Sequence, residues 1–425
     1  AVLLLIGVLA GIRHVTRPLP PPTFKIVDTK SLGRKSFVVT EATGTEIALR
    51  TGDTSFKLPL QTHAPGYDGL EVKLDGNARR YPLKKGGALV ELQLEQSRSV
   101  VKLTAIDWLG RAVPVEQSLV VILDREPPTV RWGPLPESSL KGCRLTGVLS
   151  EPSLRPRFAL LAESVEYSPE DGRFSFDPTA HEALTKPEDY FLFVTDLVGN
   201  EAKIRIPVRV VDVDGAGTHS TLVSAMDQRT LPPRARIFLR PIKPDKPLPT
   251  KLEDKIKFSH RMAVRLEHVE DIELIGEVVL GRRPRIAKGP SDDFPIMFEL
   301  DGGLVRIRDV DLLHISVDDK KFVDQQAGLR KAILALRKNS EADLPAYFPV
   351  ALIKRGELHL DGVRAGIRSD VPDAVPFIVG RGDASEGPPP RIRVTNSMIE
   401  FRGQVLHGFG LSHAIGEFRN CWIHG

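Results

Sequence analysis

Alternation of apolar and polar residues dominates the first half of the chain. Ser55–Leu60, Leu70–Leu74 and Leu89–Leu94 each place apolar side chains at every second position. This period is typical of a strand with one buried face. Asp75-Gly76-Asn77, directly after the second stretch, is a strong hairpin-turn sequence. Because no long helical pattern occurs between residues 24 and 212, this half is predicted to be all-β.

The same half contains an internal repeat. The stretch from Val101 to Gly110 aligns with the stretch from Tyr190 to Gly199, about one sandwich module of roughly 100 residues further on. In each copy a strand ends in Asp-x-x-Gly, with Asp107 and Gly110 in the first copy and Asp196 and Gly199 in the second, and another strand follows. The Asp side chain can bond the backbone of the turn, while Gly tolerates a positive φ.

This hairpin resembles the last hairpin of bacterial immunoglobulin-like domains. Pro127-Pro128-Thr129-Val130, which follows the first copy, is similar to the opening of the next such domain. The resemblance implies two tandem immunoglobulin-like domains, over residues 31–126 and 127–213. One larger sandwich with a chance internal similarity is the alternative.

From about residue 256 the pattern changes to short strands that each end in a polar turn. Four such segments superimpose, with these residues at the turn position: Asp309, Gly362, Asn396 and Asn420. Single rungs of this kind cannot bury their apolar faces, but stacked rungs share one core. The longer gaps hold insertions, namely a loop over residues 380–390 and a predicted amphipathic helix over residues 324–337.

The stretch from Val264 to Gly276 resembles the repeat signature of pectin-lyase-like proteins. That resemblance implies a right-handed parallel β-helix over residues 256–425, after a junction and a first β-helix strand in residues 214–255. Because Trp422–Gly425 stops within a rung, we expect the β-helix to be incomplete at its carboxyl end.

The amino terminus is apolar and then changes abruptly. Residues 1–12 are apolar, and residues 13–30 form a spacer that begins with basic residues and continues with Pro18-Leu19-Pro20-Pro21-Pro22. Twelve residues are shorter than the roughly 20 that cross a bilayer as a helix. They fit the remnant of a truncated transmembrane helix, the core of a signal peptide or a buried strand pair. The first interpretation predicts a single-pass membrane protein with most of this chain extracytoplasmic.

Charge and cysteine content exclude some functions. The 59 basic and 55 acidic residues give a net charge of only +4. The basic runs lack the interleaved aromatic residues that stack on bases, so nucleic acid is not an expected partner. Cys143 and Cys421 are far apart, and we expect no disulfide between them.

Candidate chemistry is sparse. β-Helix lyases and hydrolases of the resembled family use clustered acidic residues, but Asp309 occupies the repeated turn position and Asp311 follows it closely. His407 and His413 lack the spacing of a typical metal site. We therefore predict no catalytic residue, no cofactor and no metal ligand. Trp108, at the tip of a predicted turn, is the side chain expected to be exposed and to contact a ligand.

Together these features predict a non-enzymatic surface or sensor ectodomain. Its immunoglobulin-like domains would form a stalk, and its β-helix would present a face to a polysaccharide or a surface protein. A membrane-anchored polysaccharide lyase or glycoside hydrolase is the alternative from another class, and a scaffolding role in the cell envelope is a third.

Overall fold

The structure is a computed structural model whose described residues fall into two compact units. The described residues are 19–27, 38–42, 46–140, 142–151, 156–158, 165–179, 190–213, 217–250, 252–288, 296–316, 350–369, 377–383, 385, 387–403 and 408–425. The first unit comprises Ala1–Thr129, Glu151–Leu154 and Val194–Ala202, and the second unit comprises Val130–Ser150, Arg155–Phe193 and Lys203–Gly425.

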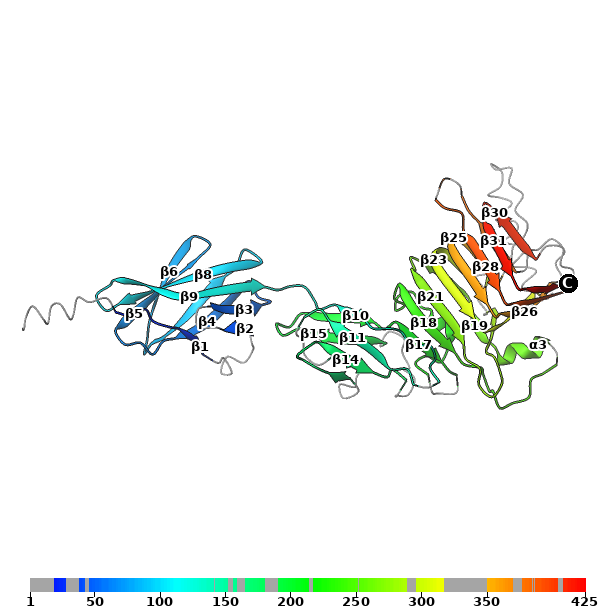
Figure 1. Cartoon of the computed structure of the whole chain (residues 1–425), viewed down its shortest axis with the longest axis horizontal. Helices are drawn as coiled ribbons and strands as arrows, with labels where there is room; N and C mark the ends of the chain where they lie inside the picture. Colours follow the sequence, from blue (N-terminus) through cyan, green and yellow to red (C-terminus); the bar gives the residue numbers. More distant parts are fainter. Residues whose placement is uncertain are drawn as a thin grey trace, which may run out of the picture. The chain divides into compact units, whose positions relative to one another are not determined.

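The first unit is a β-sandwich of the immunoglobulin-like kind (Figure 1). One sheet contains β1 (Lys25–Ile26), β4 (Ser55–Gln61) and β7 (Gly87–Gln93), and the other contains β2 (Val38–Ala42), β3 (Glu46–Thr51), β9 (Ala112–Leu123), β8 (Arg98–Asp107), β5 (Tyr67–Leu74) and β6 (Asn77–Pro82). Alternate residues of β4, namely Phe56, Leu58 and Leu60, are buried in a core shared by both sheets. The period-two pattern of the sequence therefore predicts these strands correctly.

The predicted hairpin at Asp75-Gly76 is confirmed. The antiparallel register pairs Leu74 directly with Asn77, so the turn contains only two residues. Asp75 and Gly76 have φ values of 48° and 90°. Two central residues with positive φ match the right-handed twist of the flanking strands, which explains why Asp-Gly is favoured there.

The chain between residues 130 and 205 forms two further antiparallel sheets. One sheet contains β10 (Val130–Trp132), β11 (Leu145–Leu149), β14 (Arg173–Phe176) and β13 (Glu166–Tyr167), and the other contains β12 (Arg157–Phe158), β15 (Phe191–Thr195) and β16 (Glu201–Arg205). Trp132, Phe174 and Phe176 pack together, with ring centroids 5.6–6.4 Å apart. Short antiparallel strands around such a core are what the immunoglobulin-like resemblance implies.

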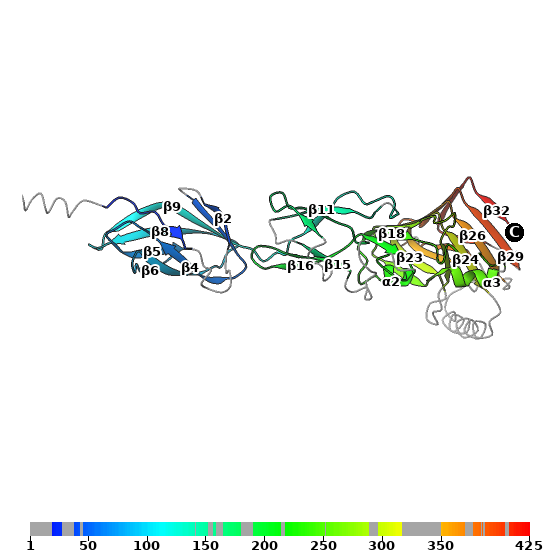
Figure 2. The same cartoon turned by 90° about the horizontal axis from the view of Figure 1, so that it is seen from below.

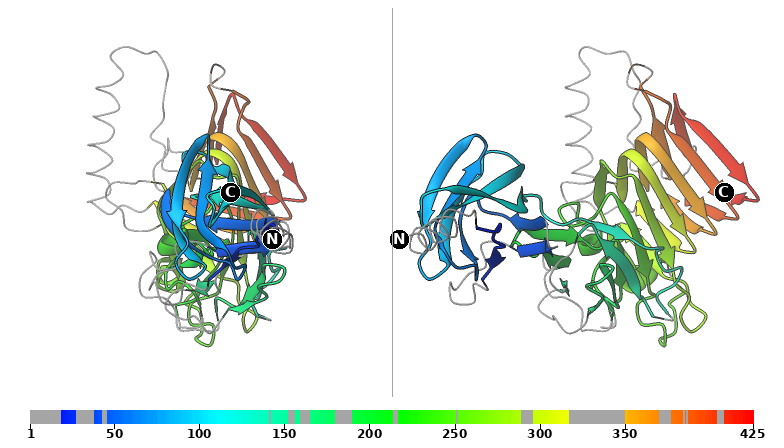
Figure 3. Two further views of the ribbon diagram at one scale, coloured as in Figure 1. Left: turned by 90° about the vertical axis from the view of Figure 1, so that its left-hand side faces the viewer. Right: turned by 60° about the vertical axis from the view of Figure 1, so that its left-hand side comes forward.

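The rest of the second unit consists of parallel strands that alternate between two sheets (Figures 2 and 3). The larger sheet contains β17 (Val208–Val211), β18 (Arg234–Leu239), β20 (Val264–Glu267), β21 (Asp271–Gly276), β23 (Phe298–Arg308), β25 (Ala351–Asp361), β27 (Ile378–Arg381), β28 (Arg391–Thr395), β30 (Phe409–Ser412) and β31 (Ile415–Arg419). The smaller sheet contains β19 (His260–Met262), β22 (Arg285–Lys288), β24 (Asp311–Ser316), β26 (Arg364–Ser369), β29 (Met398–Gly403) and β32 (Trp422–His424). Short helices α2 (Leu222–Ala225), α3 (Leu252–Lys255) and η4 (Ile256–Phe258) lie in the connections.

The repeated turn residues stand at the corners where the chain passes from the larger sheet to the smaller one. Their φ values are 57°, 63°, 50° and 52° for Asp309, Gly362, Asn396 and Asn420. The N–H groups of the first three each donate to a carbonyl of the following turn at 3.1 Å. The side-chain amide of Asn420 also donates to the Asn396 Oδ1 at 2.7 Å. Gly, Asn and Asp tolerate this backbone conformation, which accounts for the repeat seen in the sequence.

A second bend interrupts the long strands β23 and β25. Gly303 and Gly356 have φ values of 78° and 90°. A Cβ atom on Gly303 would lie 1.9 Å from the Val269 carbonyl oxygen, and one on Gly356 would lie 2.2 Å from the Gly303 carbonyl oxygen. Both positions therefore require glycine, because the backbone of the preceding turn approaches Gly303 and that of strand β23 approaches Gly356.

The start of the parallel sheet differs from the sequence-based expectation. The sequence repeat predicts a strand after Gly199, which we place at Ala202 to Val211 as the last strand of the second predicted sandwich. The chain instead leaves its antiparallel partner before Pro207, which has no N–H to donate, and β17 pairs in parallel with β18. Arg209 on β17 is fully buried and donates to the Ala225 carbonyl and, at 3.2 Å, to the Thr230 hydroxyl. Burial lowers the pKa of Arg209 to about 10.

Two sequence-based expectations lie outside the described residues. They are the apolar segment over residues 1–12 and the amphipathic helix over residues 324–337. Within the part of the chain that the structure describes, no helix combines the length and apolar character needed to cross a membrane.

Substituting Gly303 by Ala should destabilise the second unit more than the same change at Gly302. Both glycines have positive φ, which costs an Ala about 1–2 kcal/mol. Nothing lies within 4 Å of the Cβ position of Gly302, whereas Gly303 faces the Val269 carbonyl. Overlap of this kind adds roughly 1–3 kcal/mol. Urea unfolding of both variants measures the difference, and equal losses would contradict the close approach.

Candidate functional site

The Asp-x-x-Gly turn of the first unit is held together by a buried carboxylate. Asp107 is 1% exposed and accepts hydrogen bonds from the N–H groups of Leu109 at 2.9 Å and Arg111 at 2.8 Å. Gly110 follows with a φ of 77°. Burial alone would raise the pKa of Asp107, but the hydrogen bonds and the charge of Arg111 lower it below its usual value. The carboxylate is therefore engaged by its own turn.

The second copy of the motif uses the same contacts. Asp196 is buried and accepts hydrogen bonds from the N–H groups of Val198, Gly199 and Asn200 at 2.9, 2.6 and 2.8 Å. Gly199 has a φ of 101°. The predicted hairpin-turn residues thus lie in two turns of matching geometry.

Trp108 lies directly after the first of these carboxylates and points outward. Its side chain is 51% exposed, and the next residue, Leu109, is 44% exposed. The Trp108 N–H donates to the Gly66 carbonyl at 3.1 Å, which fixes the backbone of the turn. Trp108 and Leu109 therefore form an exposed apolar pair, which makes this turn a candidate for contact with a ligand.

A hollow of about 420 Å³ lies beside Trp108 on the sheet that contains β5, β6 and β8. Gly69 pairs with both Ile106 and Pro82 across neighbouring strands, so a residue without a side chain lies between two apolar ones. We name this site the Trp108 hollow. The sequence predicts the exposed tryptophan of this site but not Gly69 and its apolar neighbours, because the pairing of Gly69 depends on strand register.

Polar groups border the Trp108 hollow. Asp68 and Arg80 contribute charges, and Arg80 forms an ion pair with Glu71 at 2.9 Å. Tyr81 borders the hollow with its backbone, because its side chain shares the inner face with Leu70 and its hydroxyl donates to the Glu91 carbonyl of the other sheet at 2.9 Å. The site therefore combines an exposed indole, apolar walls and hydrogen-bonding groups, the mixture typical of sites for small polar ligands.

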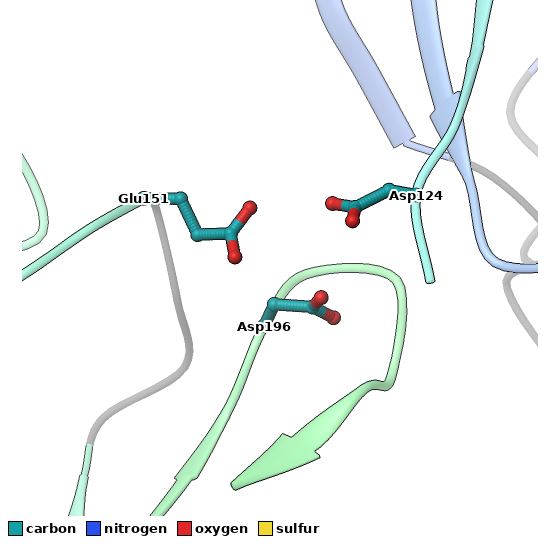
Figure 4. A group of neighbouring side chains, drawn as sticks. All are labelled: Asp124, Glu151 and Asp196. Carbon is teal, nitrogen blue, oxygen red and sulfur yellow. The ribbon is translucent and has the colours of Figure 1, made fainter. Parts of the chain in front are cut away.

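Three carboxylates also converge in the first unit (Figure 4). Asp124, Glu151 and Asp196 place oxygen atoms within 4.8 Å of one another. The Arg50 guanidinium donates to Asp124 at 3.1 Å and also to Glu151. The sequence gives no signal of this cluster, because its members come from segments far apart along the chain.

Arg50 accounts for the cluster without a metal ion. Carboxylate oxygens could serve as ligands of a divalent cation. Arg50 already supplies positive charge to two of the carboxylates, and Asp196 is engaged by its own turn. Burial, followed by the neighbouring charge of Asp124, raises the pKa of Glu151, and Arg50 opposes this rise. The arrangement is best explained as a charge cluster that joins segments of the first unit.

The remaining acidic candidates are paired with arginine. Asp309 lies 3.3 Å from Arg283, and Asp311 lies 3.4 Å from Arg285. Burial raises the pKa of Asp311, although the nearby arginines oppose the shift. His413 is a positive-φ turn residue, and His407 lies outside the described residues.

Comparisons with known proteins show only weak likeness. The chain is similar to fibronectin(III)-like modules of Clostridium thermocellum CbhA at 13% identity and a TM-score of 0.23, over 40% of this chain and 92% of that one. It is similar to SGBP-B of the Bacteroides ovatus mixed-linkage glucan utilization locus, in complex with a mixed-linkage heptasaccharide, at 13% identity and a TM-score of 0.17, over 45% and 49%. It is also similar to murine CEACAM1b, at 13% identity and a TM-score of 0.18, over 38% of this chain and 95% of that one. No protein-family model and no curated protein matches the chain.

Replacing Arg50 by Gln should destabilise the first unit in a pH-dependent way. Asp124 and Glu151 would lose their shared cation, at a cost of about 1–2 kcal/mol at pH 7 for such a partly exposed group. The pKa of Glu151, already above its ordinary 4.5, should rise further because Arg50 now lowers it. The folded state then holds this proton more tightly than the unfolded state, so stability falls as pH rises through the raised pKa.

Urea unfolding at pH 7 and pH 5 measures this effect. The loss caused by Arg50→Gln should be smaller at pH 5, where protonation of Glu151 relieves the repulsion. Arg80→Gln is the matched control, because it breaks an exposed ion pair worth under about 1 kcal/mol. Equal losses for Arg50→Gln at both pH values would count against the charge cluster.

Proposed function

We propose that this protein is a non-enzymatic, glycan-binding ectodomain and that the Trp108 hollow is its sugar-binding site. The observation that carries the proposal is the half-exposed indole of Trp108 above a hollow of about 420 Å³ with apolar walls and a polar border. The C–H faces of a sugar ring are apolar and pack on an aromatic face, while its hydroxyl groups need donors and acceptors nearby. Asp68 and Arg80 offer such groups.

We further propose that the parallel strands of the second unit are coils of a β-helix. Their support is the parallel pairing of consecutive rungs and the positive-φ residues at each corner. In this proposal the immunoglobulin-like modules form a stalk, and the apolar residues 1–12 belong to a membrane anchor.

Protease treatment of spheroplasts, in which both the cell surface and any periplasmic chain are accessible, tests this placement. An extracytoplasmic chain should be cut without lysis, whereas a cytoplasmic marker stays intact. Protection of the chain until the cells are lysed would overturn the proposed location.

The outward charges of the parallel sheets favour binding over hydrolysis or elimination. Glu273 is paired with Arg236 at 2.7 Å and with Arg308 at 2.6 Å. Glu299 is paired with Arg265 at 3.2 Å and with Lys354 at 2.5 Å. Both carboxylates thus serve as ion-pair partners between neighbouring strands, which is a structural role.

Trp108→Ala should weaken the binding of neutral polysaccharide about tenfold or more, because it removes the stacking surface. Trp108→Phe should retain part of the affinity. Leu109→Ala is the matched control, since it removes an exposed apolar residue of the same turn. Affinity gel electrophoresis with laminarin and galactomannan measures the changes.

Two outcomes would contradict the proposal. One is unchanged affinity of Trp108→Ala for every polysaccharide that the unaltered protein retains, or no retention at all. The other is the release of reducing sugar or unsaturated ends when the protein is incubated with the same polysaccharides or with acidic ones. That release would favour the lyase or hydrolase alternative.

A further inference from the structure

The outer face of the sheet β10-β11-β14-β13 carries a second hollow, in the second unit. Its volume is about 670 Å³. The register pairs Arg131 with Val148, and Val148 with Arg173, across three adjacent strands. Directly paired residues share a face of the sheet, so two arginines flank one small apolar residue. We name this row the arginine row.

The neighbouring row on the same face carries small polar side chains. Thr146 pairs with Ser175, and Ser175 pairs with Glu166. The Gly133 N–H donates to the Thr146 carbonyl at 2.8 Å, so a residue without a side chain lies at the end of this row. Small residues between larger ones explain why this sheet face is hollow.

Positive charge exceeds negative charge in the arginine row. Arg173 forms an ion pair with Asp171 at 3.2 Å, and Glu166 is paired with Arg144. Arg131 is exposed and has no ion-pair partner among the residues that the structure describes. The guanidinium of Arg131 therefore remains available to an anionic ligand.

We propose that this face binds a polysaccharide that carries carboxylate groups. An arginine can hold a carboxylate through two parallel hydrogen bonds, which neither a lysine nor a hydroxyl can match. Val148 offers an apolar surface to a sugar ring, and the Thr146 hydroxyl can bond a sugar hydroxyl, whereas the Ser175 hydroxyl is engaged by Glu166 and Arg144. The site is separate from the Trp108 hollow and does not depend on it.

The position of the hollow favours a saccharide over an acidic peptide. An extended peptide gains much of its affinity by pairing with the free edge of a sheet. Strands β11 and β14 lie inside this sheet, and each is paired on both sides. Recognition at this face must therefore come from side chains, which suits the dispersed carboxylates and hydroxyls of a polysaccharide.

Binding of alginate to the full chain tests the proposal. Arg131→Gln and Arg173→Gln should each weaken binding about threefold to fivefold, as expected for an exposed ion pair, and the double variant should weaken it further. Raising the salt concentration should weaken binding by the unaltered protein, because added ions screen exposed charges. Arg98→Gln, which removes an exposed arginine of the first unit, should leave alginate binding unchanged. Thermal unfolding of each variant establishes that the sandwich remains folded.

The results that would contradict this proposal differ from those that would contradict sugar binding at the Trp108 hollow. No retention of alginate, or equal retention by the double variant, would overturn the proposal even if Trp108 governs neutral polysaccharides. If the protein retains polyglutamate as strongly as alginate, and the same variants lose that retention, the ligand class is an acidic peptide and not a saccharide. If Trp108→Ala alone abolishes alginate binding, the arginine row is not the site.

Discussion

The parallel pairing of one rung with the next is the constraint on which the larger part of the structure depends. Because paired residues of parallel strands share a face, one buried position repeats from rung to rung, as in Ile237, Leu274, Ile307, Leu360 and Val394. At this position each strand contributes one apolar residue to a continuous core, and other inward positions of the same strands, such as Ile272 and Val305, add to it. The pairing persists only if every rung turns at the same place, which is why the corners keep the same positive φ.

Outward charges follow from the same register. Arg236 on β18 faces Glu273 on β21, and Arg393 on β28 faces Glu417 on the directly paired β31. Opposite charges on directly paired residues stabilise a sheet, whereas like charges would repel. Carboxylates that would suggest catalysis in an isolated sequence therefore contribute to strand pairing. Among the residues that the structure describes, this explains why acidic side chains of the parallel sheets are paired with basic ones.

Features with a local chemical cause could be predicted from the sequence. Asp107 and Asp196 bond their own turns, and Asn396 tolerates a positive φ. The sequence signal of each residue therefore lies within a few positions of it. The sequence contains no comparable local signal for Arg209, Gly303 and Arg50. Their roles depend on the Ala225 carbonyl, the Val269 carbonyl and Glu151, which only folding brings near. The arginine row is hidden for the same reason, since its members belong to three strands.

The two Asp-x-x-Gly turns have the same backbone arrangement but expose different side chains. In each turn the aspartate points inward to bond the backbone, so the next residue must point outward. That residue is Trp108 in the first copy and Leu197 in the second, and both are exposed. An indole offers a flat aromatic face to a sugar ring, whereas a leucine side chain offers none. The shared turn therefore sets the direction of the outward residue, and the identity of that residue favours the first copy as the sugar-binding one.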